Sequence, residues 1–164
     1  MNASSPNPRG PGSAGVSAVL ALVLAIISFF ALTIGGLGFL SLLTETDIIS
    51  VPGLGQLPGV IGMVSAVAVF ALLLGVVLRA AHPSYFASIG VALATALVHL
   101  GAVWITASGT GDGPVSAGTA VGQLVLGGAS ALIAASALIA AWGGIALRRT
   151  RAQHPQWPWE KRGE

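Results

Sequence analysis

Four long apolar runs dominate the chain and constrain what it can fold into. They cover about residues 15–43, 59–79, 84–107 and 115–147. Each run reaches or exceeds the roughly 20 residues that a helix needs to cross a hydrocarbon core of about 30 Å. Backbone polar groups in lipid must be satisfied within their own segment, so each run is expected to be helical. The sequence therefore predicts an all-α membrane protein, a bundle of four transmembrane helices.

The composition agrees with this class. Of the 164 residues, 54% are hydrophobic and only 7% are charged, whereas a soluble domain carries roughly 25% charged residues. A chain so poor in charge could not cover its surface in water. Cysteine is absent, which excludes disulfides and thiolate metal sites. The bias toward Ala, Gly, Val and Arg is typical of bacteria with GC-rich genomes.

The flanking segments set the expected domain limits. Residues 1–13 are rich in Pro, Gly, Ser and Asn and are expected to form a disordered cytoplasmic tail. The transmembrane domain covers residues 14–148, and residues 149–164 form a basic, Trp-containing tail. The first run is longer than a membrane crossing requires, so it must tilt, protrude or break, with Gly35–Gly38 as the expected weak point. The fourth run is expected to be one helix.

The charges predict the orientation of the bundle. Four spans place both termini on one side, and that side carries every basic residue of the chain. The positive-inside rule then places both termini in the cytoplasm and the protein in the cell (plasma) membrane. The basic residues adjoin the spans, so they are expected to face lipid headgroups rather than nucleic acid. They are Arg9, Arg79, Arg148, Arg149, Arg151, Lys161 and Arg162, against Glu45, Asp47 and Asp112 on the other side.

Small and polar residues mark the helix faces that are expected to point inward. In lipid, helix interfaces favour small and hydroxyl residues because these let backbones approach closely. Steps of three and four residues place such residues on one face of the third run, with a Leu- and Trp-rich face opposite. The inward face holds Tyr85, Ser88, Ala92, Thr95, His99, Ala102 and Thr106, and the outward face holds Leu93, Leu97, Leu100 and Trp104.

The other runs carry comparable stripes. The fourth run has Ser116, Thr119, Gln123, Gly127, Ser130, Ala134, Ala137, Ala141 and Gly144 at steps of three or four; the first has Ala14, Ser17, Ala21, Ala25, Ser28 and Gly35; the second has Gly62, Ser65, Ala68 and Gly75. These stripes are expected to meet in the bundle centre. Ala and Gly are common throughout the chain, so the hydroxyl, amide and imidazole positions carry most of this prediction.

His99 is the one ionisable residue well inside an apolar run. Helical rise places His99 and Gln123 at a common depth of roughly 12–14 Å below the outer surface. A buried imidazole needs a hydrogen-bond partner. The sequence predicts a bond from His99 to Gln123, with Thr95 as a second candidate partner.

Two interpretations of His99 stay open. It could handle protons or contact a ligand, or it could be a packing residue that stays neutral. A proton relay would need further ionisable groups along the path, and a metal would need several ligands. The sequence favours the packing role.

The C-terminal tail also allows two interpretations. Trp157 and Trp159 lie beside Lys161 and Arg162, which suits an interfacial anchor on an anionic leaflet. The same residues could form a recognition motif for a cytoplasmic protein partner.

The chain shows no sequence signature of catalysis. It lacks a nucleophile with a base at sensible spacing, paired intramembrane carboxylates and a metal-ligand cluster. We therefore expect a non-enzymatic protein without a cofactor, an accessory or assembly subunit of the cell envelope. The alternative is a small transporter or channel whose pore forms in a homo-oligomer.

The four-span layout, the Ala/Gly/Val bias, the lack of Cys and the closing Trp157-Pro158-Trp159-Glu160 are together similar to small uncharacterised actinobacterial membrane proteins. The resemblance covers the whole chain, and only the closing tetrapeptide is specific. It implies the four-helix fold and no activity.

Overall fold

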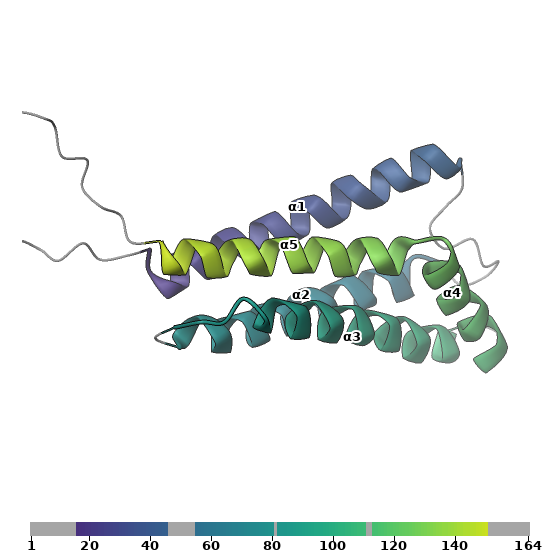
Figure 1. Ribbon diagram of the computed structural model, residues 1–164. Helices are drawn as coiled ribbons and strands as arrows, with labels where there is room; N and C mark the ends of the chain where they lie inside the picture. Colours follow the sequence, from purple (N-terminus) through teal and green to yellow (C-terminus); the bar gives the residue numbers. More distant parts are fainter. Residues whose placement is uncertain (1–15, 46–54, 81, 111–112, 151–164) are drawn as a thin grey trace, which may run out of the picture.

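A computed structural model describes residues 16–45, 55–80, 82–110 and 113–150. This part of the chain is all-helical (Figure 1). Four of its helices are long and apolar enough to cross a membrane, and the short helix α4 lies between the last two of them. The helices are α1 (Ala18–Thr44), α2 (Leu57–Arg79), α3 (Ala87–Thr110), α4 (Pro114–Leu126) and α5 (Ala129–Arg149).

The four long helices form an antiparallel bundle. Helix α2 packs most extensively on α3, α5 packs on both α1 and α3, and α1 also contacts α2. Helix α4 packs on α3 at the end of the bundle where α5 begins (Figure 1). The start of α1 and the end of α5 lie together at the opposite end. Large apolar side chains are exposed on every helix, which suits lipid better than water.

Aromatic and aliphatic side chains fill the bundle centre. Phe29 of α1 and Phe70 of α2 are fully buried, and their rings stack with centroids 4.6 Å apart at 23°. The main apolar cluster extends from this pair through Leu74, Leu78 and Ile133. A second cluster joins the end of α3 to α4 and the start of α5, with Val103, Ala107, Ala117, Ala120, Leu124 and Ala129.

The fourth apolar run is two helices, so the expectation of one helix over 115–147 is wrong. Gly128 adopts a left-handed conformation with φ +82°, and the N–H of Gly127 donates to the carbonyl of Gln123 at 2.8 Å. Glycine takes this conformation without a Cβ penalty, which is why it commonly ends helices. The apolar pattern hid the break because both halves are apolar.

The break also shifts the inward face of α4. The sequence placed Ser116, Thr119 and Gln123 inward, but the buried side chains are those one position further on, Ala117, Ala120 and Leu124. On α5 the predicted positions Ala137, Ala141 and Gly144 are buried. The predicted stripe assumed one continuous helix over residues 115–147, but the helix is interrupted at Gly127–Gly128.

Helix α1 is unbroken through Gly35–Gly38, so of the three alternatives of tilting, protruding or breaking, the break does not occur. Leu132 of α5 packs where Gly36 lacks a side chain, since a Cβ on Gly36 would lie 2.8 Å from Leu132 Cδ2. Ala21 and Ala25 are buried as expected, whereas Ser28 and Gly35 are exposed. Ala14 lies outside the described residues.

On α2, only Gly62 of the predicted stripe is fully buried. Ser65 and Gly75 are half-buried and Ala68 is exposed. Large side chains, with Phe70 and Leu74 among them, take the inward positions instead. Small residues indicate sites where two helix backbones approach closely. Most of the α2 interface is instead filled by large side chains.

Candidate functional site

The polar centre of the bundle lies on α3, as the sequence predicts. Ser88, Ala92, Thr95 and His99 are all buried on this face, and Leu93, Leu97 and Trp104 are exposed opposite it. Near the end of α3 the buried face moves to Val103 and Ala107, while Ala102 and Thr106 are half-buried.

The imidazole of His99 lies against α2. A Cβ on Gly62 would be 3.3 Å from both Cδ2 and Nε2 of His99, and 2.6 Å from Cγ2 of Val103. Gly62 thus provides the space into which the imidazole and the valine pack. His99 is 5% exposed, and its Nδ1 atom is buried without a hydrogen-bond partner.

Nδ1 of His99 therefore makes neither of the two hydrogen bonds that the sequence predicts. The Thr95 hydroxyl donates instead to the Val91 carbonyl at 2.7 Å. Gln123 lies half-buried on α4, and α4 packs on the Val103–Ala107 end of α3, beyond His99. The helical break at Gly127–Gly128 is the physical reason, because the depth argument treated 115–147 as one straight helix.

A second polar side chain lacks a partner. The Thr33 side chain on α1 is fully buried, and its Oγ1 atom has no hydrogen-bond partner. Buried hydroxyl groups are normally hydrogen-bonded, and leaving one unpaired costs about 1–3 kcal/mol. Thr33 and His99 are the two described residues with such an orphaned side-chain atom. Both face inward from apolar helices.

A basic and aromatic cluster lies at the end of the bundle where α5 finishes. Arg148 donates from Nε to the Leu78 carbonyl and from Nη1 to the Val16 carbonyl, each at 3.4 Å. It thereby ties α5 to the last turn of α2 and to the start of α1. Carbonyls in the last turn of a helix lack intrahelical donors, so a guanidinium is a suitable partner.

The neighbouring Arg149 contacts α3 instead. Its guanidinium carbon lies 4.7 Å from the centroid of the Tyr85 ring, within the range of a cation–π contact. The centroids of the Tyr85 and Trp142 rings are 5.8 Å apart. The two consecutive arginines of α5 therefore fix different neighbours at the same end of the bundle.

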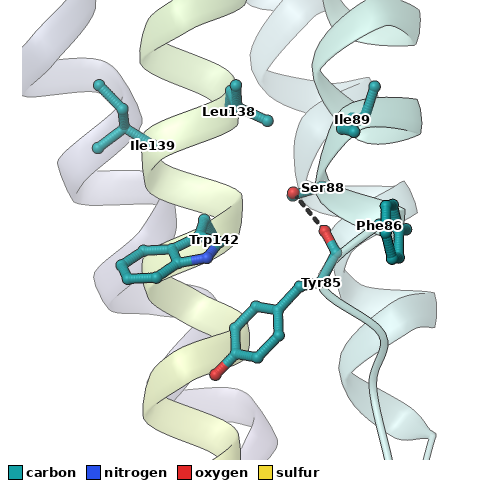
Figure 2. Close-up of a pocket in the computed structure, with 7 residues that line it drawn as sticks. All are labelled: Tyr85, Phe86, Ser88, Ile89, Leu138, Ile139 and Trp142. Carbon is teal, nitrogen blue, oxygen red and sulfur yellow. Dashed lines mark hydrogen bonds between the residues drawn. The ribbon is translucent and has the colours of Figure 1, made fainter.

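Beside this cluster a groove of about 550 Å³ runs between α3 and α5. Figure 2 shows Tyr85 and Trp142 at one end of the groove, with Ile89 and Leu138 further along. Ser88 turns its hydroxyl to the Tyr85 carbonyl, so the groove surface is almost entirely apolar.

Sequence reasoning placed Arg149 beside the lipid headgroups but missed Trp142. Trp142 is half exposed and precedes the arginines of α5 by less than two turns, a spacing typical of an interfacial aromatic. The contact between Gly62 and His99 was also missed, because Gly62 was one small residue among many. The predicted tail residues Trp157, Trp159, Lys161 and Arg162 lie outside the described residues.

The fold and this polar centre define an all-helical protein compatible with insertion in a membrane, with four helices able to span it. The chain belongs to a family of unknown function, DUF6121, whose model matches residues 14–164. No curated protein and no solved structure matches the chain.

Proposed function

We propose that the protein is a non-enzymatic accessory or assembly subunit of the cell envelope. In this proposal it crosses the plasma membrane four times, with both termini in the cytoplasm. The observation that carries it is the filled bundle centre, where Phe29 stacks on Phe70 and fully buried Leu74 and Ile133 continue the packing. Side chains occupy the axis along which a monomeric pore would have to run.

The outer surface supports a role in assembly. At exposed glycines on α1 and α4, such as Gly38 and Gly118, a Cβ would meet nothing within 4 Å beyond the adjacent backbone of its own helix. Small residues let helices of two proteins approach closely in lipid. The chain thus offers backbone surfaces that its own helices leave uncovered.

Site-specific photo-crosslinking in native membranes tests the proposal. A photoreactive residue at exposed Phe39 on α1 or Leu126 on α4 should give a discrete adduct with another membrane protein. The same residue at buried Phe70 serves as the control and should give none. Only random lipid adducts at both exposed positions would refute an accessory role.

Deleting residues 152–164 then separates the two interpretations of the tail. If the tail binds a partner, the deletion removes the adduct and leaves membrane extraction unchanged. If it is an interfacial anchor, the deletion makes the protein easier to extract and leaves the adduct in place.

The orphaned polar atoms favour one second candidate, a transporter or channel that forms its pore as a homo-oligomer. His99 Nδ1 and Thr33 Oγ1 are buried without partners, and water or a small polar solute would satisfy them. Crosslinks to a second copy, together with a flux in reconstituted vesicles that His99→Leu abolishes, would favour this candidate. Vesicles without flux at any protein density would exclude it.

A further inference from the structure

The groove between α3 and α5 combines an apolar floor with an amphipathic end. Ile89, Leu138 and Ile139 are partly exposed along it. Tyr85 and Trp142 close the end that lies next to the last turn of α5 (Figure 2). Tyr and Trp favour the level of the lipid headgroups, where one side of the ring meets hydrocarbon and the other meets water.

No carboxylate among the described residues pairs with the guanidinium at this end. Arg149 is exposed, and its guanidinium lies over the Tyr85 ring. Within the described part of the chain Glu45 is the one acidic residue, and it lies at the opposite end of the bundle. The described residues therefore leave the positive charge at this end of the groove open to an anion.

We infer that this groove binds one anionic phospholipid, with an acyl chain along Ile89 and Leu138 and the phosphate at Arg149. Basic pockets between membrane helices bind anionic headgroups by the same combination of charge and shape. The inference rests on the membrane placement of the bundle and not on the accessory role.

The dimensions favour a lipid chain over a partner helix. The α5 side chains that line the groove run from Leu138 to Trp142, which spans about 6 Å of helix rise. A helix is about 10–12 Å across and packs through contacts repeated over several turns. A single acyl chain is narrow enough to follow this short groove and continue into the bilayer.

Trp142 fluorescence in vesicles tests the inference on the full chain. Trp104→Phe, Trp157→Phe and Trp159→Phe leave Trp142 as the sole tryptophan. The probe is a minor fraction of brominated phosphatidylglycerol in phosphatidylcholine vesicles, compared with the same fraction of brominated phosphatidylcholine. We expect the anionic probe to quench Trp142 more strongly than its share of the lipid predicts.

The arginine variants show whether the charge causes this preference. Arg149→Gln should weaken it about fivefold, the effect of one surface charge. Arg149→Lys should keep most of it. The matched control is Arg79→Gln, which removes a charge from the same end of the bundle on α2, outside the groove, and should change it little.

Three outcomes would overturn the inference. Equal quenching by both probes would mean that the groove does not select anionic lipid. Equal losses in Arg149→Gln and Arg79→Gln would mean that the bundle end attracts anions without a site. Quenching by neither probe would mean that a second copy or another protein covers Trp142. The crosslinking test of the accessory role uses other residues and is independent of each outcome.

Discussion

At the scale of the residue, Gly62 lies against both His99 and Val103 in one of the tight contacts of the bundle. The space that Gly62 leaves is filled by Val103 and by the Cδ2–Nε2 edge of the imidazole. Protein interiors are packed so tightly that one added methyl group changes the stability of the fold. The sequence identified His99 because it is the one ionisable residue in its run. It could not identify Gly62 as its neighbour, because a glycine carries no signal of what packs against it.

Gly62→Ala should therefore destabilise the pairing of α2 and α3. Its Cβ would stand 2.6 Å from Val103 Cγ2, and overpacking of this kind costs about 1–3 kcal/mol. Thermal unfolding in a mild detergent measures this loss of stability. Gly101→Ala on α3, where a Cβ would meet nothing within 4 Å, is the matched control. The double variant Gly62→Ala/Val103→Ala should recover part of the loss. Equal melting temperatures of Gly62→Ala and Gly101→Ala would contradict the described contact.

Substitutions of His99 separate packing from polar function. His99→Leu should change the free energy of unfolding by less than about 1.5 kcal/mol, because Nδ1 has no partner to lose. His99→Ala should cost about 2 kcal/mol or more, because it leaves a cavity. Chemical or thermal unfolding in detergent compares the two. If His99→Leu unfolds as readily as His99→Ala, the imidazole makes a polar interaction that stabilises the bundle.

At the scale of the element, the predicted runs and the observed helices agree best where the chain is apolar without interruption. Residues 59–79 and 84–107 correspond to α2 and α3 with small shifts at their ends. The inward face of α3 was predictable because it carries hydroxyl and imidazole groups. On α1 and α2 the prediction succeeded only at small residues such as Ala21, Ala25 and Gly62. Inward Phe29 and Phe70 were missed because they belong to the same residue class as the side chains that face lipid.

Paired glycines show the same limit of the sequence. The chain has Gly-Gly at 35–36, 127–128 and 143–144, and only the second pair ends a helix. The first and third stay helical, with Gly36 beside Leu132 and Gly144 beside Ala25. Glycine is favoured both where two helices pack closely and where a helix ends. The residue that packs against the glycine from a neighbouring helix decides which of the two occurs.

The helical break at Gly128 can be tested by choice of substituent. Gly128→Ala should destabilise the fold by about 1–2 kcal/mol, because its φ of +82° disfavours a Cβ. Gly128→Asn should cost less, since Asn enters this region more readily than other residues with a side chain. Unfolding midpoints of both variants in detergent give the comparison. An alanine variant as stable as the wild type would mean that α4 and α5 can join into one helix.

At the scale of the whole molecule, the two described ends of the chain meet. Arg148 at the end of α5 contacts the carbonyl of Val16 just before α1, so both ends lie at one end of the bundle, as the four proposed membrane crossings would require. The basic residues Arg79, Arg148 and Arg149 gather there as well. This distribution supports the proposed cytoplasmic position of both termini.

A C-terminal reporter tests that orientation. A fluorescent protein that matures only in the cytoplasm should be bright when fused after residue 164, and a phosphatase active only outside should be inactive there. Placing the same reporters after residue 112, in the segment between α3 and α4, should give the opposite pair of results. A phosphatase active at the C-terminus would reverse the proposed orientation.

The pairing of α1 with α5 sets an order of events during synthesis. Helix α1 leaves the ribosome first, yet it packs mainly on α5, which leaves last. The α2–α3 hairpin, with its short connection, has its partner at hand much earlier. Until α5 arrives, Ala25 lacks its neighbour Gly144, and the space at Gly36 lacks Leu132. A nascent chain halted before residue 129 would thus hold the α2–α3 hairpin and a first helix that lacks its main partner, a species that membrane quality control could recognise.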